Sequence, residues 1–242
     1  MSGECNRQFD YTRNFIRQNF MTTVRFPGAV SGLTTFDLNN NRFGGSLFKR
    51  SSGIHVVTLD RAGAHSKGTP LMGYWVPQGG YCDIPIRPRG AGLVFTPDFS
   101  GCSILVDQIS HDHYRVYHVE GGGNYLQTQY LSQPRHGLGL AATMTFHDYG
   151  DAAYPRGFAF LKHEDGRWWI YFQRQNGVGL SFVRNKKFQA AGAQTVRGGG
   201  RIPVADLMRE VPRHGASHSG QELAVTRNIK AQKRMLPNDE LW

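Results

Sequence analysis

Short apolar stretches rich in β-branched and aromatic residues recur through the middle of the chain, separated by turn residues. Such stretches, about four to eight residues long, are typical of β-strands. Helical spacing of apolar positions is confined to residues 6–20, 204–211 and 221–235. The pattern predicts a mixed class with strands in excess. The predicted strands are residues 54–59, 92–95, 102–108, 114–119, 141–146, 158–162, 168–173 and 179–183.

Two pairs of these strands are predicted to form hairpins. Glu164-Asp165-Gly166 supplies turn residues between the strands at 158–162 and 168–173. The polar stretch at residues 109–113 separates the strands at 102–108 and 114–119 in the same way. In an antiparallel pair, the start of the first strand lies opposite the end of the second.

The length of 242 residues fits one β-rich domain with a proper core. We assign residues 1–212 to this domain and residues 213–242 to a basic, polar C-terminal tail. From Ala193 onward the chain becomes polar and basic, and we expect a loosely attached segment there. A monomer is expected.

The formal net charge of +10 favours acidic partners. Nucleic acid is an alternative partner, because arginines alternate with aromatics at residues 7–17 and 167–174. We do not expect it as the main partner, since no nucleic-acid-binding motif is found. No membrane span, signal peptide, disulfide framework or metal site is predicted, and His111-Asp112-His113 is interpreted as a solvated turn.

Cys102 and His118 are the candidate catalytic residues. Cys102 precedes one predicted strand and His118 ends the next, so the hairpin register brings a thiol and an imidazole to one end of the sheet. Backbone N–H groups of Gly101, Cys102 and Ser103 are candidates for an oxyanion hole. The alternative is a buried structural cysteine.

The Ser100-Gly101-Cys102 sequence, followed by a strand and then by a strand ending in Tyr117-His118, resembles the glutamine-deamidase toxins. These include the catalytic domain of cytotoxic necrotizing factor and Burkholderia lethal factor. The resemblance covers residues 91–120. It implies an α+β fold with a β-sandwich or β-barrel core of mainly antiparallel strands and flanking helices. It also implies that Thr96, six residues before Cys102, orients His118 through an oxygen atom.

The expected function is that of a bacterial toxin or effector that converts a host glutamine to glutamate through a thioester, with no cofactor. His118 would deprotonate Cys102, and an imidazolium would lower the pKa of the thiol. The implied substrates are a Rho-type GTPase or a translation-initiation RNA helicase, reached in the host cytosol after secretion or injection. The alternatives are a cysteine peptidase and a non-catalytic basic module that binds protein or nucleic acid.

Overall fold

The computed structural model describes residues 2–24, 26, 28–43, 54–64, 66, 68–121, 130, 137–176, 180–183, 187–190, 195–210 and 241–242. Its helices are α1 (Ser2–Gln8), α2 (Thr12–Gln18), α4 (Phe146–Tyr149) and α5 (Leu207–Glu210). Its strands are β1 (Phe20–Thr22), β2 (Gly32–Phe43), β3 (Ile54–Arg61), β4 (Leu71–Trp75), β5 (Tyr81–Pro85), β6 (Leu93–Phe95), β7 (Ser103–Gln108), β8 (His113–Val119), β9 (Gly139–Met144), β10 (Arg156–Glu164), β11 (Arg167–Asn176), β12 (Leu180–Val183), β13 (Lys187–Ala190) and β14 (Thr195–Pro203).

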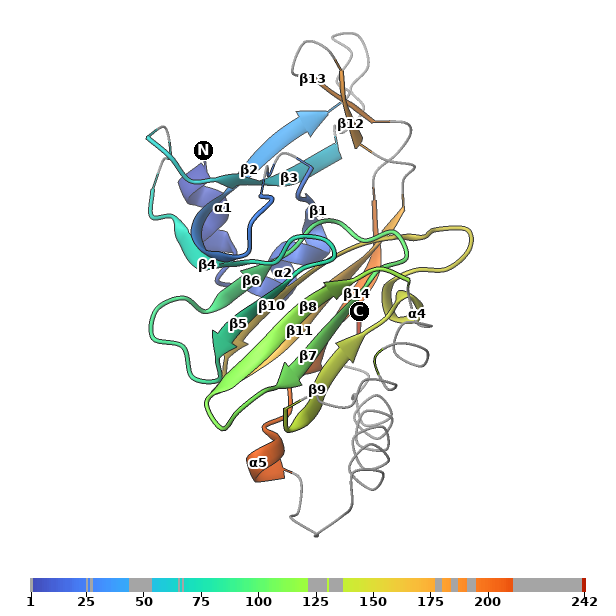
Figure 1. Ribbon diagram of the computed structural model, residues 1–242. Helices are drawn as coiled ribbons and strands as arrows, with labels where there is room; N and C mark the ends of the chain where they lie inside the picture. The colour runs from blue at the N-terminus through green and yellow to red at the C-terminus, as the bar shows by residue number, and fades with distance from the viewer. Residues whose placement is uncertain are drawn as a thin grey trace, which may run out of the picture.

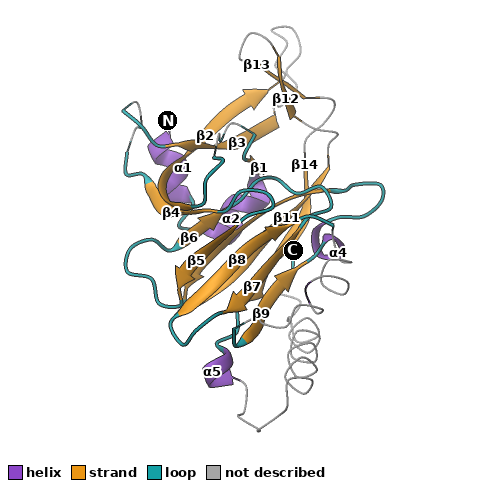
Figure 2. Cartoon of the chain, viewed as in Figure 1, coloured by secondary structure: helices purple, strands orange, loops and turns teal. Residues whose placement is uncertain are grey.

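The strands form two main sheets that pack face to face (Figure 1). The larger sheet has the order β1-β3-β2-β4-β6-β10-β11-β14, and the smaller one has the order β5-β8-β7-β9. The β12–β13 hairpin is separate from both. Most pairs are antiparallel, but β1 pairs with β3 and β4 pairs with β6 in parallel. Figure 2 shows how few residues are helical, so the predicted α+β class with a strand-rich core is confirmed.

Much of the large sheet, including β10 and β11, is buried on both faces, which gives the molecule two apolar cores. Between the sheets, Ile104 and Val106 of β7 pack with Ile170 and Phe172 of β11. On the opposite face, α1 and α2 cover the sheet with an aromatic cluster that includes Phe9. Strands buried on two faces read as almost continuous apolar runs, which is why β10 and β11 stand out in the sequence.

The helix predicted over residues 6–20 is instead two short helices, α1 and α2. The break lets the rings of Phe9 and Phe15 meet edge to face at 5.5 Å over the large sheet. The predicted helix at residues 204–211 contracts to α5, and the one at 221–235 lies outside the described residues. The predicted strand at 141–146 ends at Met144, because Phe146 begins α4.

The expectation of a loosely attached segment from Ala193 onward is wrong for β14. This strand pairs with β11 from Thr195 to Pro203. Its run Arg197-Gly198-Gly199-Gly200-Arg201 carries few apolar side chains, so its sequence lacks the strand pattern. Of the predicted tail at 213–242, the structure describes Leu241 and Trp242, and these two residues lie against β14.

Buried amide side chains fasten the N-terminal segment to the large sheet. Gln173 of β11 accepts a hydrogen bond from the Met21 backbone N–H at 3.1 Å and donates to the carbonyls of Ile16 and Asn19, the latter at 2.8 Å. Gln175 donates to the Met21 carbonyl at 2.7 Å. These contacts satisfy backbone groups at the end of α2, at Asn19 and at Met21 in the short strand β1.

We expect Gln173→Leu to lower the free energy of unfolding by about 2 to 3 kcal/mol, because it leaves buried backbone groups without partners. Chemical denaturation measures this loss. Gln78→Leu is the matched control, since Gln78 makes an exposed contact with Glu120 and should change stability by less than about 0.5 kcal/mol. Equal effects of the two substitutions would contradict this role of Gln173.

Candidate functional site

The β7–β8 hairpin brings Cys102 and His118 to one end of the smaller sheet. The ladder pairs Ile104 with His118 and Ser103 with Val119. Cys102 lies two residues before Ile104, so it shares the inward face with His118 and is its diagonal neighbour. The predicted hairpin is therefore confirmed, and it brings Cys102 and His118 to the same end of the sheet, although His118 lies directly opposite Ile104 and not opposite Cys102.

Thr96 fixes the tautomer of His118. The Thr96 hydroxyl donates its single proton to the Val76 carbonyl at 2.7 Å. Its oxygen lies 2.6 Å from His118 Nδ1, and with its proton already engaged it can only accept there. The proton of the neutral imidazole therefore resides on Nδ1, and Nε2 carries a lone pair. The contact uses the threonine hydroxyl, one of the oxygen atoms that the resemblance allowed.

His118 is fully buried, with 0% of its surface exposed. Its ring stacks on Phe99 with centroids 4.5 Å apart and an interplanar angle of 5°. Burial lowers the pKa of His118 to about 4. No side chain in the described part of the chain hydrogen-bonds Nε2, so a neutral imidazole with a free acceptor faces the space between the sheets.

Cys102 is 9% exposed, and burial raises the pKa of its thiol, with the nearby Glu120 charge adding to the rise. A backbone contact from Ser100 opposes the shift. The expected thiolate–imidazolium pair is therefore not the resting state of this structure: the thiol pKa is raised and the imidazole pKa is lowered, so both groups are neutral near pH 7. Both shifts have the same cause, because burial penalises the charged form of each group.

Tyr149 was not anticipated from the sequence, yet its hydroxyl braces the loop before β7. It accepts from the Gly101 N–H at 2.8 Å and donates to the Cys102 carbonyl at 2.9 Å. The Gly101 amide proposed for the oxyanion hole is thus engaged with Tyr149. A capping box between Thr145 and Asp148 starts α4 and positions this tyrosine. The Thr-x-x-Asp spacing was the sequence signal that could have revealed it.

Cys82 is a second thiol on the face shared by His118. It pairs with Val116 across β5 and β8. Cys82 therefore flanks His118 on the β5 side, and Cys102 flanks it on the β7 side. Burial raises its pKa to about 11. Cys5 lies in the other core, under α1. All three cysteines are free thiols.

A model of the family described as Mcf1 activator-binding domain matches residues 65–202. The match covers more than half of the chain and runs from before β4 almost to the end of β14. The chain belongs to the Mcf1 activator-binding domain family. The comparison with curated proteins found no match.

The resemblance to glutamine-deamidase toxins is wrong as a family assignment. The Mcf1 activator-binding domain is a different family, and its match spans the whole window at 91–120 that carried the resemblance. The physical reason is that any antiparallel hairpin brings the residue before its first strand close to the end of its second. A cysteine and a histidine at these two positions do not distinguish one strand-rich family from another.

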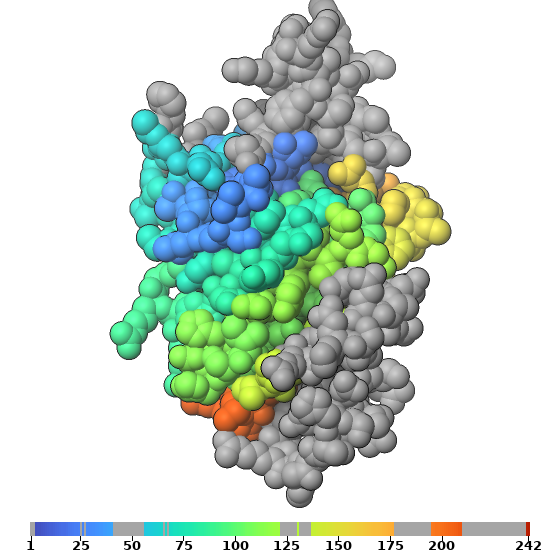
Figure 3. All heavy atoms as spheres, in the orientation of Figure 1, coloured from blue at the N-terminus to red at the C-terminus, as the bar shows by residue number. Residues whose placement is uncertain are grey.

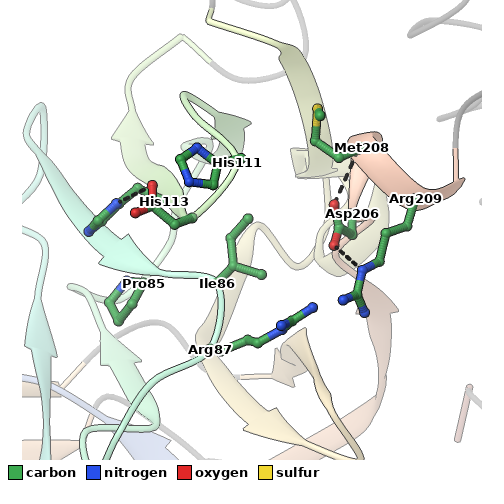
Figure 4. Close-up of a pocket in the computed structure, with 9 residues that line it drawn as sticks. Pro85, Ile86, Arg87, His111, His113, Asp206, Met208 and Arg209 are labelled. Atoms are coloured by element: carbon green, nitrogen blue, oxygen red, sulfur yellow. Dashed lines mark hydrogen bonds and ion pairs between the residues drawn. The ribbon is translucent and has the colours of Figure 1, made fainter. Parts of the chain in front are cut away.

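The chain also has a surface pocket of about 410 Å³ at the opposite end of the hairpin. His111 in the β7–β8 turn and His113 at the start of β8 line it together with Arg87 and with α5, where Figure 4 shows Met208 and Arg209. Asp206 pairs with Arg209 at 3.5 Å. This pocket is separate from Cys102 and His118, which lie at the other end of the β7–β8 hairpin.

Among the described residues there is no group of three histidine, cysteine or acidic side chains arranged to hold a metal ion. None of the described helices is both long and apolar enough to cross a membrane.

The outer face of the smaller sheet holds a buried acid, Asp107. Tyr130 and Tyr117 hydrogen-bond its carboxylate, but desolvation outweighs them and raises the pKa of Asp107 to about 7. Tyr130 also packs with Leu105, Val119 and Leu140 over this face. The two strands of one hairpin thus carry an acid with a raised pKa and a histidine with a lowered one.

These two groups should give opposite pH dependences of stability. On acidification from pH 8 to 5, folded Asp107 takes up a proton more readily than unfolded Asp107, and this stabilises the fold. His118 takes up a proton more readily in the unfolded state, because burial lowers its pKa in the folded state, and this destabilises the fold. We expect His118→Gln to become more stable by about 2 kcal/mol relative to wild type over this range, and Asp107→Asn to become less stable by about 2 to 3 kcal/mol. Urea denaturation at the two pH values measures both. Parallel pH curves for the three proteins would contradict the shifts.

Proposed function

We infer that this chain is a binding domain for a protein activator. The family match over residues 65–202 is the observation that carries this proposal, because the family is described by its activator binding. The matched segment includes the whole smaller sheet, so the proposal concerns the body of the fold.

Exposed apolar side chains on the large sheet support a contact surface for such a partner. Leu33 on β2 is 61% exposed and Met72 on β4 is 50% exposed. The ladder pairs Leu33 with Tyr74 and Thr35 with Met72, so Leu33 and Met72 are diagonal neighbours on one face. Adjacent exposed apolar residues on a sheet favour protein association more than isolated ones do.

The partner expectation from the sequence was a Rho-type GTPase or a translation-initiation RNA helicase in the host cytosol. These two partners were implied by the deamidase resemblance, which the family match has corrected. They are therefore used only as purified test substrates in the mass-spectrometry assay below. The three free thiols support action in a reducing compartment such as the cytosol.

We expect Leu33→Glu combined with Met72→Glu to weaken activator binding at least tenfold, because two charges would be buried on association. The immobilised chain captures the partner from host cytosol, and titration calorimetry with the purified partner measures the affinity. Met208→Glu is the matched control: Met208 is 37% exposed and lies on α5, far from β2 and β4 (Figures 1 and 3).

Wild-type affinity in the double variant would contradict this surface. Failure of the wild-type chain to bind any captured or candidate protein on purification would contradict activator binding itself.

The second candidate function is hydrolysis of a glutamine carboxamide by a thiol. The observation that favours it is the Thr96 contact, which leaves His118 Nε2 as a proton acceptor beside the Cys102 face. In this proposal Nε2 takes the thiol proton as the sulfur attacks the carboxamide carbon, and the imidazolium then protonates departing ammonia. Water hydrolyses the thioester to leave glutamate. Because both groups rest in their neutral forms, partner binding would have to open the site.

The test is mass spectrometry of a captured partner and of the two candidate proteins after incubation with the chain. A gain of about one mass unit at a glutamine is expected with wild type and Cys5→Ser, and it should vanish with Cys102→Ser. His118→Ala should slow the reaction by about 10²-fold or more. Loss of the product with Cys82→Ser, and not with Cys102→Ser, would identify Cys82 on β5 as the nucleophile. Product from Cys102→Ser, or no product in any mixture, would refute Cys102 as the nucleophile.

A further inference from the structure

The outer edge of β14 is partly closed by residues from a distant part of the sequence. Leu241 bridges Gly200 in antiparallel fashion. Gly199 and Trp242 exchange two backbone hydrogen bonds, each 3.0 Å long. Such reciprocal bonds are those of an added antiparallel strand, reduced here to two residues.

The glycines of β14 permit this close approach. A Cβ at Gly198 would lie 2.4 Å from the Trp242 carbonyl oxygen. A Cβ at Gly199 would lie 2.3 Å from the Phe172 carbonyl oxygen on β11 and 2.9 Å from Trp242 Cζ2. Gly198 also has a φ of +130°, a conformation that other residues rarely adopt. An edge strand that keeps glycine at both positions offers its backbone as a template and leaves room for a large ring.

The indole of Trp242 lies in a built socket. It packs at the margin of the aromatic core beneath α2, and the Arg13 guanidinium lies 5.9 Å from its ring centroid. Its N–H is buried, and no described residue accepts a hydrogen bond from it. The socket therefore selects an aromatic face and makes no use of the indole N–H, so phenylalanine fits equally well.

A surface groove of about 350 Å³ lies beside this socket. Arg13, which covers the indole, also lines the groove, and Arg201 of β14 lines it further along the strand. Glu164 and Tyr171 complete its floor. The groove thus runs from β14 across β11 to Glu164 at the end of β10, on the sheet face that α2 covers, and gives a bound segment further contacts beside the socket.

We propose that the β14 edge is a peptide-binding site for an extended segment carrying a large aromatic side chain, with Leu241–Trp242 as its intramolecular ligand. The ligand adds a strand to β14 through backbone bonds, and its aromatic ring supplies the specificity. A peptide in trans must displace Leu241–Trp242, so the segment restricts access to the site. This site is distinct from the Leu33–Met72 surface and does not depend on activator binding.

The test uses a fluorescein-labelled, amidated peptide with the sequence of residues 237–242 and the full-length chain. By fluorescence anisotropy, the Trp242→Ala chain should bind this peptide saturably, and wild type at least tenfold more weakly because its own segment competes. A peptide with phenylalanine in place of tryptophan should bind comparably. Peptides with alanine there, or with a methyl group on the tryptophan backbone nitrogen, should lose binding at least tenfold.

Equal binding of the N-methylated peptide would overturn strand addition, and equal binding by the wild-type and Trp242→Ala chains would overturn competition by Leu241–Trp242. A concentration-dependent dimer that disappears in Trp242→Ala would overturn the intramolecular assignment.

Amide hydrogen exchange gives a measurement independent of the peptide: Gly199 should be protected in wild type and exchange at least tenfold faster in Trp242→Ala. Unchanged exchange in a folded variant would also overturn the proposal.

Discussion

The packing of the smaller sheet against the large one determines the chemistry of every group near Cys102. The inward residues of β8 alternate as Tyr114, Val116 and His118, and all three are buried. An imidazole at such a position must satisfy its N–H within the protein, and Thr96 does so. The same burial keeps the imidazole neutral and raises the thiol pKa, so the packing that stabilises the fold also holds both groups in their uncharged forms.

The strands that could be predicted are those with enough apolar residues in a row to be recognised from the sequence. β7, β8, β10 and β11 all lie against the inter-sheet core, and their runs are long and apolar. β2 was missed because buried polar contacts replace apolar packing in part of it: Asp37 accepts a hydrogen bond from Asn6 at 2.9 Å. β14 was missed because glycine there serves a close approach between backbones, which leaves no hydrophobic signal.

The candidate site was predictable to the extent that it depends on hairpin register. Register alone places Cys102 and His118 on one face, and the structure adds the Thr96 hydroxyl to them. Tyr149 and Cys82 were missed because they reach the site through tertiary packing of α4 and β5: the Thr145-x-x-Asp148 spacing marks the start of α4 but not what the helix packs against. The family could not be read from three residues, since their arrangement is a property of hairpins in general.

The fastening of the N-terminal segment has a consequence for synthesis on the ribosome. Met21 depends on Gln173 and Gln175, which are made more than 150 residues later. At about 5–20 residues per second, the first helices wait roughly 8 to 30 seconds for the strand that holds them. Phe9, Phe15 and Ile16 form a buried cluster in the finished protein, and during that interval they are exposed aromatic and aliphatic surface. Such exposed apolar surface is the kind that chaperones bind, and it is covered once β11 has emerged and folded against it.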